Sequence, residues 1–239
     1  MRGLTDKVVI VTGGAGGIGK ATCCRFAEEG AKVAIFDLNA EAAEAAVAEI
    51  KEAGGVAEAV VVDLTDYEAV QKAVADTESS LGPVDVLVNN AGWDRFTPFL
   101  KTDPDFWQKI ISINLLSVLN MSHVVVAGMA ERGAGRVVNV ASDAGRVGSS
   151  GESVYSACKG GIIAFTKTLA REHARQGLTF NTVCPGLTDT AMFDGFLEAA
   201  GNPDKLRETF RRAIPLGRIG QPEDLPGAIL FLSSDDAAF

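Results

Sequence analysis

Short apolar runs alternate with longer segments of helical periodicity along the whole chain. The runs carry no alternating polar face, so they predict strands buried on both sides, as in a parallel sheet. The predicted strands cover residues 7–12, 31–37, 56–62, 84–88, 135–141 and 178–184. The segments between them favour helices, among them residues 41–53, 66–80, 103–131 and 222–234.

This alternation of strand and helix predicts an α/β fold. Parallel strands need crossover helices, and right-handed crossovers build one doubly wound, Rossmann-type sheet with helices on both faces. The sequence has no internal repeat and no interdomain linker, so we expect residues 1–239 to form a single domain. Residues 187–215 are irregular with helical stretches, and we expect them to form a small lid.

Glycines and polar residues gather where the predicted strands end, which is where open parallel sheets bind ligands. Residues 12–19 read Thr-Gly-Gly-Ala-Gly-Gly-Ile-Gly and join the first strand to a helix. Glycines at such a turn let the backbone approach a pyrophosphate at the helix N-terminus. The turn therefore predicts cofactor contacts from Gly13, Ala15, Gly16, Gly17, Ile18 and Gly19.

Asp37 ends the second predicted strand and indicates which dinucleotide binds. A carboxylate at this point accepts hydrogen bonds from the adenosine ribose hydroxyls and repels a 2′-phosphate. No arginine or lysine follows it directly, so we expect NAD rather than NADP. Alone, Asp63 or an Asn-Asn-Ala-Gly segment would be an ordinary turn, but the shared strand-end position favours a binding role. Further cofactor contacts are accordingly expected from Leu38, Asp63, Leu64, Asn90, Ala91 and Gly92.

Tyr155 and Lys159 are four residues apart, so on a helix their side chains share one face. An ammonium beside a phenol favours the phenolate and lowers the pKa of the tyrosine from about 10. A tyrosine adjusted in this way serves as a general base near neutral pH. Ser142, at the end of the preceding strand, is placed to bind the same substrate oxygen. A tyrosine and a lysine with this spacing, taken alone, more often lie on a solvated helix face. Whether they form a catalytic site therefore depends on the motifs in the rest of the chain.

The charge balance narrows the class of partner. The formal net charge is −9, which disfavours a nucleic-acid partner because the chain would repel a phosphate backbone. The N-terminus has no apolar signal region and no run reaches membrane-spanning length, so we expect a cytoplasmic protein without a membrane partner. The four cysteines, Cys23, Cys24, Cys158 and Cys184, lack metal-ligand spacing. We therefore expect reduced thiols and no metal.

Taken together, these motifs resemble the short-chain dehydrogenases/reductases over nearly the whole chain. Thr12-Gly13-x-x-x-Gly17-x-Gly19 resembles the cofactor motif of that family, and Asn89-Asn90-Ala91-Gly92 its strand-four motif. Asn114, Ser142, Tyr155 and Lys159 fall where its catalytic tetrad is expected. The resemblance implies that Pro185, Gly186, Thr188 and Thr190 hold the nicotinamide carboxamide.

The resemblance also implies a mechanism, hydride transfer between a secondary alcohol and NAD. Tyr155 would take the alcohol proton, Ser142 would hold the substrate oxygen, and Lys159 would bind the nicotinamide ribose. Asn114 would organise a water that links Lys159 to solvent, although the sequence alone favours a polar helix residue there. Members of the family are usually dimers or tetramers, and we expect a homo-oligomer. They usually also continue into a seventh strand and a short tail, which often pack at a subunit interface and against the substrate pocket. The given sequence ends at Phe239, so it does not predict these two features.

A closer resemblance within the family points to the substrate. Residues 90–94, 142–152, 170–175 and 184–191 resemble a dehydrogenase of alicyclic and aromatic acid degradation. It implies oxidation of the ring hydroxyl of 2-hydroxycyclohexanecarboxyl-CoA to the 2-oxo thioester. Apolar contacts to the ring are expected from Trp93, Phe96, Met192, Phe193 and Phe196. Contacts to the CoA phosphates are expected from the basic residues Arg95, Arg146, Lys205, Arg207, Arg211 and Arg212.

Other interpretations stay open at this point. The apolar residues proposed to contact the ring could equally belong to the hydrophobic core. The basic residues proposed to bind CoA more commonly form a solvated, charged helix face. The same family includes 3-oxoacyl-thioester reductases, 3-hydroxyacyl-CoA dehydrogenases and sugar or polyol dehydrogenases. Asp37 argues against an NADPH-dependent reductase, and a polyol enzyme would not need the basic lid. A catalytically silent NAD-binding sensor or scaffold is a different class, which the intact tetrad disfavours.

Overall fold

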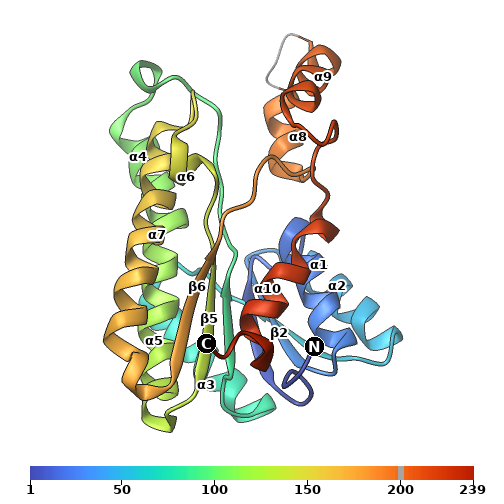
Figure 1. Ribbon diagram of the computed structural model, residues 1–239, viewed down its shortest axis with the longest axis vertical. Helices are drawn as coiled ribbons and strands as arrows, with labels where there is room; N and C mark the ends of the chain where they lie inside the picture. The colour runs from blue at the N-terminus through green and yellow to red at the C-terminus, as the bar shows by residue number, and fades with distance from the viewer. Residues whose placement is uncertain (199–201) are drawn as a thin grey trace.

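Six parallel strands form the central sheet of the computed structural model, which describes residues 1–198 and 202–239 (Figure 1). The strand order is β3-β2-β1-β4-β5-β6, so the predicted doubly wound fold is confirmed. Each predicted strand overlaps an observed one. The strands are β1 Val8–Thr12, β2 Lys32–Asp37, β3 Val56–Val61, β4 Val86–Asn89, β5 Gly135–Val140 and β6 Leu178–Val183.

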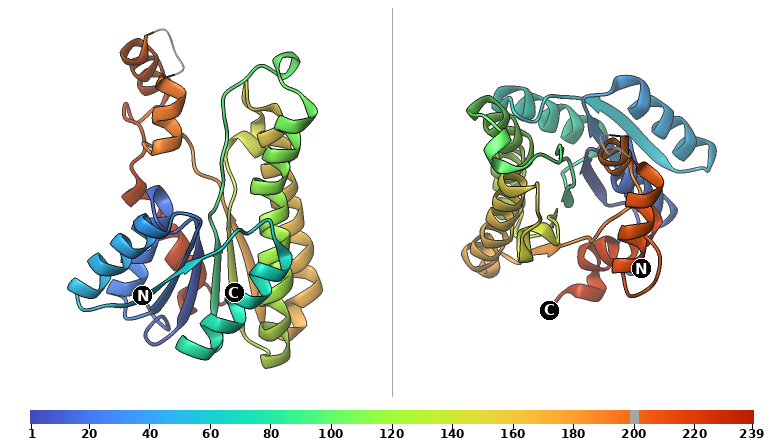
Figure 2. Two further views of the ribbon diagram at one scale, coloured as in Figure 1. Left: turned by 180° about the vertical axis from the view of Figure 1, so that it is seen from behind. Right: turned by 90° about the horizontal axis from the view of Figure 1, so that it is seen from above.

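Helices cover both faces of the sheet, as the two further views show (Figure 2). Successive side chains of a strand point to opposite faces, so Val9 and Val11 of β1 lie in one core and Val8 and Ile10 in the other. The first face packs against α1 Gly17–Glu28, α2 Ala40–Glu52 and α10 Pro226–Ser233. The second face packs against α3 Tyr67–Leu81, α5 Ser117–Arg132 and α7 Ser153–His173. Each fully buried aliphatic side chain stabilises the fold by about 1.5–3 kcal/mol.

The sheet changes winding direction at β1, which pairs with β2 on one side and with β4 on the other. The register aligns Thr12 with Phe36 and Val11 with Val88, so the strands end at one edge. A crevice forms at such a switch point because the connecting helices leave toward opposite faces. The glycine turn and the segment after β4 therefore meet at this edge.

The predicted helix over 103–131 contains an interruption. It consists of α4 Pro104–Ile111, a π-helical turn Ser112–Leu116 and α5. By length and composition, Pro104–Arg132 is apolar enough to cross a membrane, contrary to the expectation that no run reaches that length. Half of its most apolar 18 residues are buried within the fold, and Met121 and Val125 pack against the sheet, so it is a core helix. Single π-helical turns are frequent at functional sites.

Two helices, α8 Ala191–Glu198 and α9 Pro203–Ala213, stand above the carboxyl edge of the sheet (Figure 1). Both fall within the predicted lid, of which residues 199–201 lie outside the described part. Phe193, Leu197 and Ile219 form a separate small core that holds the lid together. Across the edge, the short helix α6 Ala144–Val147 packs against α7. The predicted last helix is divided into a 3₁₀ turn, Pro222–Asp224, and α10.

Candidate active site

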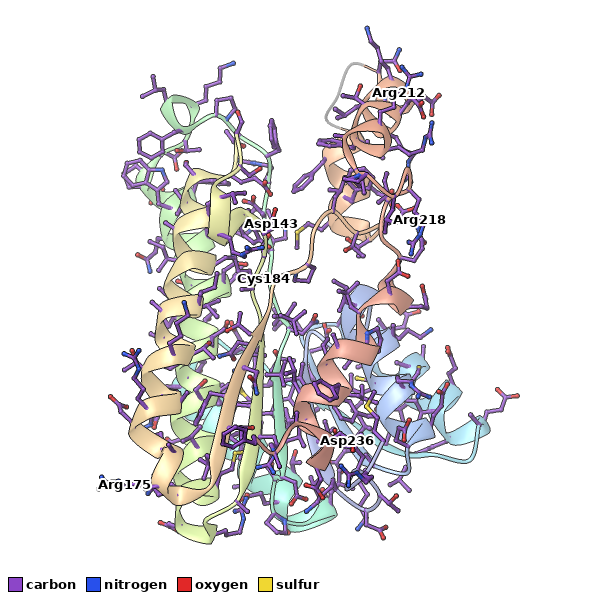
Figure 3. All side chains as sticks on the ribbon, in the orientation of Figure 1. Asp143, Arg175, Cys184, Arg212, Arg218 and Asp236 are labelled. Carbon is purple, nitrogen blue, oxygen red and sulfur yellow. The ribbon has the colours of Figure 1, made fainter. Side chains whose placement is uncertain are left out.

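A cavity of about 1160 Å³ runs along the carboxyl edge of the sheet, from the end of β2 to the lid. Asp143, just after β5, and Cys184, just after β6, mark this edge in Figure 3. The cavity brings together most of the predicted cofactor residues. These are Gly13, Ala15, Gly16, Gly17, Ile18, Asp37, Leu38, Asp63, Leu64, Asn90, Ala91, Gly92, Pro185, Gly186, Thr188 and Thr190.

The glycine turn is held against the segment that follows β4. The Asn90 side-chain amide donates to the carbonyl oxygens of Thr12 at 3.0 Å and Gly13 at 3.1 Å. The Thr12 hydroxyl accepts from the backbone N–H groups of Asn90 and Ala91, at 2.9 and 3.0 Å. Gly19 does not line the cavity; a Cβ there would overlap the Gly13 carbonyl oxygen, so its role is to let the turn close.

The end of the cavity formed by the glycine turn and Asp37 fits a dinucleotide. A Cβ at Gly16 or at Gly186 would meet nothing within 4 Å, so bare backbone faces open space at both points. The N-terminus of α1 adds the partial positive charge that favours phosphate. The Asp37 carboxylate accepts from the backbone N–H of Ala15 at 3.1 Å and that of Asn39 at 3.0 Å, which fixes it at the rim. Around Asp37 the lining residues are neutral or acidic.

Asn114 lies in the π-helical turn and does not line the cavity. Its amide donates to the carbonyl oxygens of Trp93 at 2.7 Å and Ile110 at 2.9 Å, and its oxygen accepts from Trp93 N–H at 3.1 Å. Gly92 separates it from Lys159: a Cβ on Gly92 would lie 3.0 Å from Asn114 Oδ1 and 3.4 Å from Lys159 Nζ. Asn114 is thus one glycine away from the lysine and fastens the loop after β4.

Ser142, Tyr155 and Lys159 all line the cavity. Ser142 follows β5, and its hydroxyl accepts from Ala144 N–H at 3.1 Å. Tyr155 and Lys159 share one face of α7, with Lys159 Nζ 5.5 Å from the centroid of the Tyr155 ring. The ammonium donates to the carbonyl oxygen of Val140 at 3.0 Å. The predicted constellation is therefore assembled, with a lysine fastened to the strand rather than to the phenol hydroxyl.

The expected effect of Lys159 on Tyr155 is not what this structure shows. Burial raises the pKa of Tyr155 above its ordinary value of 10, a hydrogen bond with Ser142 opposes the rise, and Glu152 and Asp94 add to it. Burial also lowers the pKa of Lys159 to about 8, because the ammonium is almost fully removed from water. The expected shift considers only the positive charge of Lys159, whereas the burial of both side chains determines the direction of both shifts.

Aromatic side chains line the end of the cavity nearest the lid. Trp93, Phe96, Met192, Phe193 and Phe196 all contribute to its surface. The rings of Phe96 and Phe196 meet edge to face across the cleft, with centroids 6.2 Å apart. Phe193 serves both roles that the sequence left open, because it faces the cavity and is buried in the lid core.

The five arginines expected to bind CoA phosphates are engaged elsewhere. Arg207 pairs with Asp189 at 2.8 Å and Asp194 at 3.2 Å, and Arg211 with Glu208 at 2.7 Å. Arg212 also pairs with Glu208, at the outer end of the lid (Figure 3). Arg146 pairs with Asp143 at 3.2 Å, and the Arg95 guanidinium lies over the Phe106 ring, 5.0 Å from its centroid. None of Arg95, Arg146, Arg207 and Arg211 lines the cavity.

Three charged residues near the cavity were not singled out from the sequence. Lys109 of α4 lines it and lies over the Trp93 ring, 4.0 Å from the centroid. Glu152 lines it just before α7, and Asp94 is buried beside it, 6% exposed. The only signal in the sequence for Glu152 was its position three residues before Tyr155, one helical turn away.

Comparisons with known proteins agree with this geometry. The sequence profile of the short chain dehydrogenase family matches residues 7–200. The acetoacetyl-CoA reductase of Rhizobium meliloti (strain 1021) is 41% identical over 235 residues, 98% of this chain and 93% of that protein. The (2S)-[(R)-hydroxy(phenyl)methyl]succinyl-CoA dehydrogenase subunit BbsD of Thauera aromatica is 37% identical over 237 residues, 99% of this chain and 93% of that protein.

Solved structures agree as well. NAD⁺-bound xylitol dehydrogenase superposes with a TM-score of 0.94 at 32% identity, covering 100% of this chain and 96% of that one. A variant of actinorhodin polyketide ketoreductase with NADPH gives the same TM-score and identity, covering 100% and 94%. The chain therefore belongs to the short-chain dehydrogenase/reductase family, oxidoreductases that use a nicotinamide cofactor to act on hydroxyl or keto groups.

Proposed function

We propose that this enzyme uses NAD to oxidise the ring hydroxyl of 2-hydroxycyclohexanecarboxyl-CoA to the 2-oxo thioester. The observation that carries the proposal is the composition of one cavity. Among the described residues, those that line it around Asp37 include no cation, and its lining also includes Ser142, Tyr155 and the aromatic side chains of Trp93, Phe96 and Phe196. A compact apolar ring fits such a wall, since pockets of this kind combine apolar surface with few polar groups.

In this proposal, the chain's residues orient the alcohol and move its proton, and the bound cofactor supplies the hydride acceptor. Tyr155 removes the hydroxyl proton, and Ser142 donates a hydrogen bond to the oxygen as charge develops on it. Lys159 holds the nicotinamide ribose, and Asn114 fixes the loop after β4 and the water path to Lys159. Pro185, Gly186, Thr188 and Thr190 hold the carboxamide.

The preference for NAD over NADP rests on Asp37. A 2′-phosphate beside this carboxylate would be repelled, and within the described part of the chain no lysine or arginine lines the cavity near it. The nearby Lys20 is paired with Glu49 at 2.6 Å, so its charge is already compensated. We further propose one catalytic domain with residues 187–215 as its lid, a cytoplasmic location and assembly as a homodimer or homotetramer.

A second candidate is favoured by the relatives. Acetoacetyl-CoA reductases at 41% identity and a 3-oxoacyl-[acyl-carrier-protein] reductase of Thermotoga maritima at 38% are named for the reduction of 3-oxoacyl thioesters. Reduction of such a straight-chain thioester is therefore the second candidate for this chain. The same residues would then catalyse the reverse reaction, in which Tyr155 donates a proton to the ketone oxygen.

One substrate panel separates the candidates. NAD reduction is followed by absorbance with 2-hydroxycyclohexanecarboxyl-CoA, the free hydroxy acid, a straight-chain 3-hydroxyacyl-CoA and a polyol. We expect the cyclic thioester to give the highest kcat/KM. Turnover of the straight chain alone would move the enzyme to the second candidate. Turnover of no alcohol with NAD bound would indicate a silent cofactor-binding protein.

A further inference from the structure

An unpaired carboxyl is buried beside the proposed reaction centre. Asp94 follows β4, is 6% exposed, and its Oδ2 has no hydrogen-bond partner among the described residues. A buried carboxyl oxygen normally has a donor, because losing water without replacement is costly. Asp94 therefore needs an explanation beyond packing.

A second carboxyl meets it from the start of α7. Glu152 lines the cavity one helical turn before Tyr155, and its carbonyl accepts from Ser156 N–H at 2.7 Å. The loop that carries Asp94 is tied to the loop that carries Glu152 by a 2.8 Å hydrogen bond from Thr97 N–H to the Gly151 carbonyl. A side chain at Gly151 would overlap the Phe96 ring, so the two loops are in close contact.

Among the described residues, no cation forms an ion pair with Asp94, and the ammonium of Lys109 lies over the Trp93 ring. Burial raises the pKa of Asp94 to about 7, and the nearby Glu152 carboxylate adds to the rise. The negative charge of Asp94 in turn raises the pKa of two other titratable groups, Tyr155 and Cys158 of α7. The neighbouring cations are turned elsewhere: Arg95 lies over Phe106, and Lys159 donates to Val140. Both carboxyls also raise the pKa of Tyr155, so their field reaches the phenol.

We propose that Asp94 and Glu152 determine which charge a substrate may carry next to its reacting carbon, admitting neutral acyl groups such as thioesters and excluding free carboxylates. The proposal rests on the proposed function only in taking Tyr155 as the mark of the reacting carbon. A carboxylate about 6 Å from an uncompensated negative charge is disfavoured by roughly tenfold to a hundredfold at the effective dielectric of a partly buried site. The pair becomes more repulsive as pH rises, because Asp94 then loses its proton.

Two ligands of matched shape test the proposal without turnover. Cyclohexanecarboxamide and cyclohexanecarboxylate are titrated into the NAD-bound enzyme, and the change in tryptophan fluorescence is followed, since Trp93 lines the cavity. We expect the wild type to bind the amide at least about tenfold more tightly at about pH 8, and less selectively at about pH 6. Asp94→Asn and Glu152→Gln should each reduce the selectivity at the higher pH by about tenfold, with little change in amide affinity. The control Asp105→Asn removes an exposed charge on α4 and should change neither.

Unchanged selectivity in both variants would overturn the proposal, as would equal binding of the two ligands, or no binding of either, to the wild type. Turnover then separates this inference from the proposed function. The ethyl ester of 2-hydroxycyclohexanecarboxylic acid and its free acid are compared as substrates. Selective ligand binding without oxidation of either ring substrate would overturn the proposed substrate and leave the charge selection standing. Oxidation of both the ester and the free acid at equal kcat/KM would overturn the charge selection and leave the proposed ring substrate standing.

Discussion

The Lys159 ammonium lies 5.5 Å from the centre of the Tyr155 ring and donates its hydrogen bond to the Val140 carbonyl, not to the phenol. Burial lowers the pKa of this lysine to about 8 and raises that of the tyrosine. Burial of both side chains therefore acts against the phenolate that the spacing of the two residues predicts.

The replacement Tyr155→Phe tests the proposed general base. It removes the hydroxyl and keeps the ring that packs against Lys159, so NAD affinity should be nearly unchanged. We expect kcat to fall by about 10²–10⁴-fold, the usual contribution of a positioned acid or base. Steady-state NADH formation and calorimetric NAD binding measure the two effects. Turnover within a few fold of the wild type would exclude the role, whereas Ser142→Ala should give a smaller loss.

The backbone arrangement was predictable because local pattern and topology agree. Six apolar runs gave the strands, and the residues that end them, such as Thr12, Asp37 and Ser142, necessarily meet at one edge of a parallel sheet. The spacing of Tyr155 and Lys159 gave their shared helical face. None of these inferences depends on contacts between distant parts of the chain.

What the sequence could not predict depends on such contacts. Arg207 is neutralised by Asp189, 18 positions away, which a count of basic residues does not reveal. Asp94 and Glu152 approach each other from separate loops. The pKa directions of Tyr155 and Lys159 follow from burial, and burial of a particular side chain is a property of the folded chain.

Lys159→Met should stabilise the protein while it removes activity. The pKa of Lys159 is about 8 when folded and 10.5 ordinarily, so between these pH values the unfolded chain binds more protons and stability rises with pH. Below pH 8 the wild type bears the cost of a buried ammonium, about 3 kcal/mol from the shift. We expect the free energy of unfolding of the variant to exceed that of the wild type by about this amount near neutral pH.

Urea unfolding across this pH range measures the effect, and the difference should shrink as the pH approaches 10.5. Lys20→Met is the control, because Lys20 is only partly buried and is paired with Glu49, and its pKa is raised. It should change stability by less than about 0.5 kcal/mol. A destabilised Lys159→Met at every pH would mean that the hydrogen bond to Val140 outweighs the desolvation of the ammonium.

Asp37→Ala should relax the preference for NAD. The change removes the carboxylate that repels a 2′-phosphate and also the acceptor for Ala15 N–H, so NAD should bind less well and NADP better. We expect the ratio of kcat/KM for NAD to that for NADP to fall by at least about tenfold, on the order of one hydrogen-bonded charge. The neighbouring Asn39→Ala, which caps α2, is the control for disturbance of this rim. An unchanged ratio would remove the ribose contact from the proposal.

Arg207→Ala tests whether Arg207 binds the CoA phosphates or only stabilises the lid. Arg207 bridges Asp189 and Asp194 and lies over the Phe193 ring, 5.2 Å from its centroid, so its loss should loosen the lid for every substrate. We expect KM to rise by a similar factor, about two- to tenfold, for a CoA thioester and for a small cyclic alcohol. Asp189→Asn breaks the same ion pair from the acidic side, so it should reproduce the effect, and the double variant should add little. A rise in KM confined to the CoA thioester, absent in Asp189→Asn, would instead return Arg207 to the phosphate-binding role that the resemblance to a CoA-ester dehydrogenase implied.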